Sequence, residues 1–248
     1  MAEELDQPSG SKGLQHGDQV SRLLANAKNN VVDRHGRGPL YEAAIMKYCP
    51  NYTSLLRLLL ESGAHPESEL NLYKPFSAVV ENGDLDSVKL MIEYGINPVN
   101  YVNQLILYKA LNNPRLEVLE FLLCMGHFDP NEMDLRNGTP LYKAIEEENP
   151  EAIQVLLNYG ARPNIACYKG LTPLHHVKYD TESDKVTKCI DILLRHGADG
   201  DALDKGGKSA LYKAAIHPPA DDKASPRDSI VNTQKDLAFF SGWGWPKT

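Results

Sequence analysis

The chain has 248 residues, a length that fits one large domain, two ordinary domains or an array of about seven repeats of roughly 33 residues. With 42% hydrophobic and 24% charged residues, the composition excludes a wholly disordered or fibrous protein. The formal net charge of −7 opposes binding to nucleic acid or to an anionic membrane surface, and no apolar run is long enough to span a bilayer.

The N-terminal end is expected to cap the domain that follows it. Residues 1–16 are predicted to be a disordered tail, because they are polar and lack the apolar core of a signal peptide. Residues 17–24 have the pattern of a single helix, and we expect this helix to cover the first of the repeated units.

One pattern recurs along most of the chain at intervals of 31 to 37 residues. It opens on a large apolar residue, found as Leu40, Phe76, Leu107, Leu141, Leu174 and Leu211. It closes on a glycine, found as Gly63, Gly95, Gly126, Gly160 and Gly197. The sequence therefore predicts five complete units and a sixth that lacks a clear end.

Each unit is predicted to contain two short helices. Thr139 and Thr172 each precede a proline, which favours a side-chain N-cap followed by a pre-set first helical turn. The second helix has apolar residues at i, i+3 and i+4, which form one face. The glycine is typical of a helix C-cap, and the proline found shortly after it in most units favours an extended arm.

This pattern closely resembles the ankyrin repeat, most clearly in residues 167–175 and 190–199, and the resemblance covers about residues 17–216. It implies an all-α solenoid of stacked helix-turn-helix units with hairpin-like arms, in which five full repeats are flanked by capping half-repeats. It also implies that partners dock on the concave surface formed by the arms and first helices. Residues 217–248 fall outside the register, and we expect a linker followed by a capping helix or a tail.

The departures from the family pattern predict local differences. The first and fifth units have four extra residues each, around 48–53 and 180–184, which indicate longer loops between the helices. The second and third units lack a polar cap, so their helices should begin less firmly. Tyrosine replaces the motif histidine at positions 41, 108, 142 and 212, and the histidine is kept only as His175.

Several residues that could support chemistry have a structural explanation instead. His175, His176 and His196 lack the further ligands of a metal site, so we expect neither metal nor cofactor. The cysteines are interpreted as reduced, buried and inert, with Cys124 and Cys189 in the apolar slots or ends of second helices. We therefore predict no enzymatic activity.

The sequence favours binding of another protein. Tyrosine and arginine often dominate interfaces, and both occur at the predicted arm tips together with several lysines. The predicted protein-binding residues are Arg37, Tyr73, Tyr101, Arg136, Lys143, Tyr168, Lys169, Lys205 and Lys208. Lys109, His176 and Lys213 extend this set into a basic strip, interrupted by glutamates, which predicts a partner with an acidic segment and aromatic or apolar anchors.

Two other interpretations remain open at this stage. The chain could be the substrate-recognition subunit of a ubiquitin ligase, although residues 228–248 contain no plain recruitment sequence. It could also be a microbial or viral effector that binds a host protein. In each case we expect a monomer that acts in the cytoplasm or nucleus, or in the host cytosol for an effector.

Overall fold

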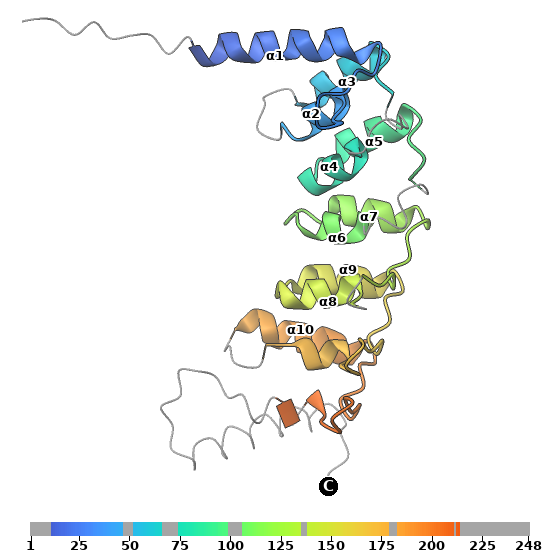
Figure 1. Cartoon of the computed structure of the whole chain (residues 1–248). Coiled ribbons are helices and arrows are strands. Elements are labelled where there is room, and N and C mark those ends of the chain that lie inside the picture. The colour runs from blue at the N-terminus through green and yellow to red at the C-terminus, as the bar shows by residue number, and fades with distance from the viewer. Residues whose placement is uncertain are drawn as a thin grey trace, which may run out of the picture. The chain divides into compact units, whose positions relative to one another are not determined.

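The computed structural model describes residues 11–46, 52–65, 74–98, 106–134, 138–178, 183–210 and 212–213. The chain divides into two compact units, residues 1–127 and 128–248, and Figure 1 labels their α-helices. The first contains α1 (Ser11–Ala27), α2 (Pro39–Ala44), α3 (Tyr52–Glu61), α4 (Pro75–Asn82), α5 (Leu85–Glu93), α6 (Ile106–Leu111) and α7 (Glu117–Cys124). The second contains α8 (Pro140–Glu146), α9 (Pro150–Asn158), the 3₁₀ helix η2 (Pro173–His176) and α10 (Asp184–Arg195).

The helices pair within each repeat and stack on the next repeat, so like helices contact like. In the first unit α2 packs on α4 and α4 on α6, while α3 packs on α5 and α5 on α7. In the second unit α8 packs on η2, and α9 packs on α10. Within the described residues the only β-pairing is an isolated bridge between Leu203 and Ser209, and no helix is both long and apolar enough to cross a membrane.

The buried face of each helix is the one that the periodicity predicts. The opening apolar residues Leu40, Phe76, Leu107, Leu141 and Leu174 are at most 1% exposed. The i and i+3 positions of the second helices are buried as well, and the polar residue between them, such as Arg57 or Lys89, is exposed. Burying each large apolar side chain contributes about 1.5–3 kcal/mol, so these two faces stabilise the stack.

The second helices end as predicted. Gly63, Gly95, Gly126, Gly160 and Gly197 all have positive φ, between 70° and 97°. In α9 the N–H of Gly160 donates to Leu157 and that of Ala161 donates to Leu156, which closes the last turn of the helix. An L side chain rarely adopts this backbone conformation, which explains the recurring glycine.

The helix starts only partly follow the prediction. Thr172 forms the predicted cap together with His175, three residues later. The Thr172 N–H donates to Nδ1 of His175 at 3.2 Å, and the Thr172 Oγ1 lies 2.8 Å from the same atom. The predicted cap at Thr139 is wrong, because its buried Oγ1 has no hydrogen-bond partner. Position 142 holds a tyrosine, which offers no ring nitrogen to this hydroxyl.

The second repeat does not follow the prediction of a weak helix start. α4 forms two turns from Pro75 without a side-chain cap, whereas the capped start at Thr172 leads only into the four-residue 3₁₀ helix η2. η2 ends where Val177 takes an extended conformation. Packing of an apolar face therefore outweighs the cap in deciding how far the first helix continues.

Asparagine side chains join successive repeats at the ends of the second helices. Asn131 accepts the N–H of Arg162 at 2.8 Å and donates to the carbonyl of Gly160 at 3.1 Å. Asn164 does the same one repeat later, with the N–H of Asp199 and the carbonyl of Gly197. Each asparagine satisfies backbone groups that the helix end leaves open.

The N-terminal helix covers the first repeat. α1 contacts both α2 and α3, and its residues Leu23 and Ala27 are buried. The helix already begins at Ser11, ahead of the expected start at residue 17.

Candidate protein-binding surface

In three arms, an aspartate closes a tight turn at the tip. The N–H of Asp204 donates to the carbonyl of Lys208 at 2.9 Å, and Oδ1 of Asp204 accepts the N–H of Lys208 at 3.0 Å. Asp33 and Asp134 form the same pair of bonds with the residue four positions later. In the fifth repeat Cys167 occupies this position and keeps only the backbone bond, to Leu171.

Two successive turns of the second unit are in direct contact. The N–H of Lys205 donates to the carbonyl of Lys169 at 3.2 Å. Gly170 permits this approach, because a Cβ added there would lie 2.9 Å from the Lys205 nitrogen, and its φ of 77° also favours glycine. The tips of the two turns therefore form one continuous surface.

The side chains of Tyr142 and His175 position these turns by hydrogen bonds to the turn backbone. The Tyr142 hydroxyl lies within hydrogen-bonding distance of the carbonyls of Ile165, at 2.7 Å, and Leu171, which share its single proton, and it accepts the N–H of Cys167 at 3.1 Å. One repeat later, Nε2 of His175 lies 3.0 Å from the carbonyl of Lys208 and donates to it. The tyrosine that replaces the motif histidine thus also binds the backbone of the next turn, through its hydroxyl. Burial raises the pKa of Tyr142.

Aromatic and apolar side chains are exposed on these turns. Tyr168 is 54% exposed, Leu203 62% and Tyr212 47%. The Lys169 ammonium lies 5.5 Å from the centre of the Tyr168 ring, and that of Lys208 lies 5.3 Å from the Tyr212 ring. Cation–π contacts at exposed sites contribute about 0.5–1 kcal/mol, and these hold each ring beside a positive charge. We call residues 165–171, 203–210, 212 and 213 the turn face.

The turn face is basic although the chain is acidic. Its two segments contain four lysines and one aspartate, a formal charge of +3. The single carboxylate, Asp204, accepts the backbone N–H groups of Lys208 and Gly206, which lower its pKa. Lys213 donates to the carbonyl of His175 at 2.7 Å. The exposed Lys169, Lys205 and Lys208 have no ion pair within the described part of the chain.

His176 lies behind the turn face and is neutral at pH 7. Burial, and then the charge of Lys213, lower its pKa to about 4. Its ring meets that of Tyr142 edge-on at 4.6 Å, and its Nε2 lies 4.0 Å from Sγ of Cys167. The predicted basic strip therefore loses this member as a cation.

The other predicted basic residues form ion pairs within the chain. Arg37 binds Asp33 at 2.7 Å and Glu42 at 2.9 Å, and its hydrogen bonds lower the Asp33 pKa to about 2. Lys143 pairs with Glu147 at 2.8 Å. Lys109, which extended the strip, pairs with Glu81 at 3.3 Å. Tyr73, Tyr101 and Arg136 lie outside the described residues.

The structure thus brings together Tyr168, Lys169, Lys205 and Lys208, and it adds two residues that sequence reasoning missed as contact residues. Tyr212 was recognised only as a motif position. Leu203 directly precedes the turn aspartate, and Met133, at the same place two turns earlier, is also exposed, at 46%. The sequence signal that could have identified Leu203 is the apolar residue that precedes each turn aspartate.

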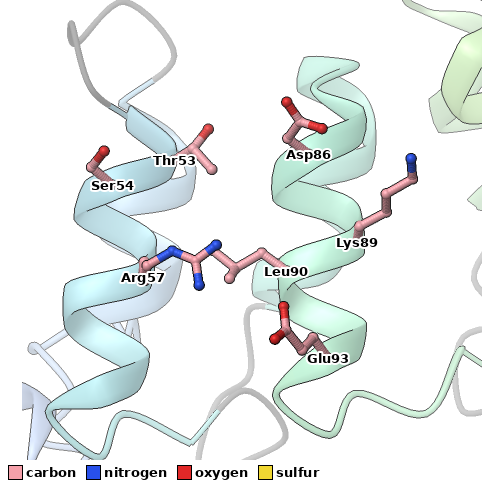
Figure 2. A pocket seen from close by; sticks show the side chains of 7 residues that line it. All are labelled: Thr53, Ser54, Arg57, Asp86, Lys89, Leu90 and Glu93. Atoms are coloured by element: carbon pink, nitrogen blue, oxygen red, sulfur yellow. The ribbon is translucent and has the colours of Figure 1, made fainter.

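Away from the turns, a depression lies between the second helices α3 and α5 (Figure 2). Its lining residues are Thr53, Ser54, Arg57, Asp86, Lys89, Leu90 and Glu93. Two cations and two carboxylates balance each other there, and Lys89 also lies over the ring of Phe121 at 5.7 Å. This depression therefore favours neither an anionic nor a cationic ligand.

Thr53, Asp84 and Ser87 form a closed hydrogen-bonding group where α3 and α5 begin. The Thr53 hydroxyl donates to Oδ2 of Asp84 at 2.8 Å, and the Ser87 hydroxyl also donates to this carboxylate. Because the polar groups satisfy one another across two repeats, their role is structural.

The histidines and cysteines are dispersed. Among the described residues no three histidine, cysteine or acidic side chains gather as metal ligands, and His196 bonds to Gln154 instead. Cys189 is buried, and burial raises its pKa to about 11. The prediction that Cys124 is buried is wrong, because it is the last residue of α7 and points to solvent.

Comparisons with known proteins agree with this geometry. A family model described as ankyrin repeats (3 copies) matches residues 107–180. The chain is 26% identical to the E3 ubiquitin-protein ligase KEG of Arabidopsis thaliana over 78% of its own length and 12% of that protein. It is 26% identical to the BTB/POZ domain and ankyrin repeat-containing protein NBCL of Lotus japonicus, over 71% of this chain and 41% of that one. The chain therefore spans less than half the length of either relative.

Solved structures show the same fold. The ankyrin repeat domain of Bcl-3 matches with a TM-score of 0.64 and 21% identity, over 94% of this chain and 100% of that one. The human ASB11 ankyrin repeat domain matches with a TM-score of 0.63 and 23% identity, over 88% and 96%. The stacked helix pairs, the glycine-ended second helices and these matches identify the chain as an ankyrin repeat protein.

Proposed function

We propose that this protein is a non-enzymatic interaction module that works as an adaptor, scaffold or inhibitor and binds its partner on the turn face. The observation that carries the proposal is the contact between two turns that together expose Tyr168, Leu203 and Tyr212 among lysines. Exposed aromatic and apolar side chains held on a rigid support are typical of binding anchors. Turns that only connect helices do not require exposed aromatic or apolar side chains.

The ankyrin fold supports this role, because its repeats present successive turns along one side. Two side chains of types that often act in catalysis, His175 and Cys189, are engaged in packing. His175 is 1% exposed and joins Thr172 to Lys208, and Cys189 is buried. Binding by surface complementarity is therefore the function that these residues support best. We further expect the protein to act in the cytoplasm or nucleus, since its cysteines at positions 124, 167 and 189 are free thiols.

Affinity capture with the full chain tests this proposal. The partner recovered by the wild type should be lost with Tyr168→Ser combined with Leu203→Ser. It should be retained with Tyr159→Ser, since Tyr159 is 42% exposed but lies at the end of α9. Quantitative mass spectrometry of the captured proteins would measure the difference. Equal recovery by both variants would refute the turn face as the binding site.

One relative gives a reason to keep a second role in view. KEG is named as an E3 ubiquitin-protein ligase, and this chain resembles 12% of it. If this chain supplies substrate recognition to a ligase, the captured proteins should include ligase subunits in addition to the turn-face partner. Their absence from the wild-type capture would argue for a simple adaptor or inhibitor.

A further inference from the structure

We propose that the partner of the turn face is an acidic segment of a protein, bound in an extended form across the two contacting turns. This inference rests on the proposed function and names the chemistry of the partner. It depends on which cations are available, where the apolar contacts lie, and how the two turns are held.

Among the predicted binding residues that the structure describes, the cations that form no ion pair lie on the turn face. Arg37, Lys109 and Lys143 already contact carboxylates of their own unit at 2.7–3.3 Å. An external acid would have to displace those carboxylates, which would offset most of the gain. Lys169 and Lys205 are exposed, and Asp204, which precedes Lys205 in the chain, is occupied by backbone N–H groups. An incoming acid meets these lysines without such a competitor.

The apolar contacts lie beside the cations. Tyr168 immediately precedes Lys169 in the chain, and Leu203 lies two residues before Lys205. Tyr212 and Lys208 contact each other across the base of the second turn. A segment that alternates carboxylates with an aromatic or aliphatic residue can therefore use both kinds of group at once. Charge alone would require the lysines but not the exposed leucine.

The two turns are held in register. The bond between Lys205 N–H and the Lys169 carbonyl, and the bond between His175 and the Lys208 carbonyl, link the backbones on which the three lysines lie. Because these turns are already held in place, binding costs little conformational entropy on the protein side. Two adjacent turns fit an extended chain that crosses both of them better than a compact charged group.

Nucleic acid is the less suitable polyanion. The whole chain carries a formal charge of −7, so a long phosphate backbone would be repelled beyond the turn face. A short acidic peptide needs only the local +3 charge. The two ligands therefore make different demands on the molecule, and they can be separated by experiment.

The test measures the binding of defined probes to the full chain by fluorescence anisotropy. The first probe is a labelled peptide of glutamates interrupted by one phenylalanine and one leucine. The second has glutamine in place of every glutamate, and the third is labelled oligothymidylate. Lys169→Glu combined with Lys205→Glu is compared with Lys185→Glu combined with Lys188→Glu, which makes the same charge change on the exposed side of α10.

We expect the acidic peptide to bind the wild type more tightly than the glutamine peptide or oligothymidylate. The turn-face variant should bind it about tenfold more weakly, while the α10 variant stays within about twofold. Raising the salt from about 50 to 150 mM should weaken binding of the acidic peptide to the wild type. Equal losses in the two variants, equal affinity for the glutamine peptide, or tighter binding of oligothymidylate would each overturn the proposal.

Failure of this inference can be told from failure of the proposed function. If the captured partner is lost with Tyr168→Ser and Leu203→Ser but kept with Lys169→Glu and Lys205→Glu, the turn face binds a protein whose contacts are not acidic. That result refutes the acidic segment and leaves the interaction module standing.

Discussion

Position 142 shows how one substitution in a repeat motif changes a hydrogen-bonding network. His175 uses both ring nitrogens, one toward Thr172 and one toward the next turn. Tyr142 reaches further into the next turn with its hydroxyl but leaves Oγ1 of Thr139 buried without a partner. The substitution therefore strengthens the link between repeats and weakens the start of its own helix.

We predict that Tyr142→Phe lowers the free energy of unfolding by about 1–3 kcal/mol, because two carbonyls and one N–H lose their shared partner. Tyr142→His should recover part of this loss by giving Thr139 a ring nitrogen. Urea denaturation followed by circular dichroism would measure both changes. Tyr159→Phe, at an exposed position, is the control and should leave the midpoint unchanged.

The buried imidazole of His176 predicts a pH dependence of stability. Its folded pKa, about 4, lies below the ordinary value of 6.5, so the unfolded chain binds the proton more readily. The contribution of His176 is thus present above pH 6.5 and is lost as the pH falls from 6.5 toward 4. Between pH 7 and 5 we expect a loss of about 1 kcal/mol, after allowing for partial exposure.

The measurement is the difference between wild type and His176→Gln, with urea midpoints taken at several pH values in this window. The variant should show a shallower fall in stability between pH 7 and 5. Parallel curves for the two proteins would contradict the prediction. His35, exposed in the first turn, supplies the control substitution.

The three described cysteines should differ in reactivity. Cys124 is exposed at the end of α7, whereas Cys189 is buried with its pKa raised to about 11. Since the thiolate is the reactive form, we expect a short iodoacetamide pulse at pH 8 to modify Cys124 in the native protein and Cys189 only after unfolding. Peptide mass spectrometry would locate the label. Modification of Cys189 as fast as Cys124 would contradict its burial.

At the scale of the element, the ends of the helices decide how repeats fit together. Gly83 ends α4 with a φ of 72°, and a Cβ there would lie 2.2 Å from the side chain of Asn113. Asn113 in turn donates to the carbonyl of Asn82 at 2.7 Å, and Asn82 donates to Ala44 at 2.6 Å. These bonds connect the first helices of three successive repeats.

We predict that Gly83→Ala destabilises the protein more than Gly95→Ala does. Both positions have positive φ, which costs an alanine about 1 kcal/mol. An added Cβ at Gly95 meets nothing within 4 Å, so only Gly83→Ala must also displace Asn113. Thermal and urea unfolding of the two variants would compare them. A Gly95→Ala loss as large as that of Gly83→Ala would remove the role assigned to Asn113.

At the scale of the whole molecule, the chain consists of two compact units, and within each unit successive repeats contact one another. In such an array, a substitution should act most strongly close to where it is made. Tyr142→Phe should therefore speed hydrogen exchange in α8 and α9 more than in α4 and α5, and Gly83→Ala should do the opposite. Exchange followed by mass spectrometry would measure this. Uniform acceleration along the chain would indicate a single cooperative unit.

The repeat, its helices and their buried faces could be predicted from the sequence because they depend on local chemistry. Apolar spacing chooses the inner face of a helix, and a glycine with positive φ ends it, as at Gly160. Thr139 shows the limit of such reasoning. At Thr172 the side chain three residues later engages the hydroxyl, whereas the tyrosine three residues after Thr139 turns away toward the next repeat.

The binding residues could be predicted only in part, for a physical reason. Lysines and arginines can be counted along a sequence, but their pairing depends on which carboxylate the fold brings within reach. Tertiary structure placed Glu42 against Arg37 and gave Lys169 and Lys205 no ion-pair partner among the described residues. By itself, therefore, the sequence determined the ankyrin architecture and the kinds of residue at the turns. Only the contact between turns decided which of their charges and rings face solvent.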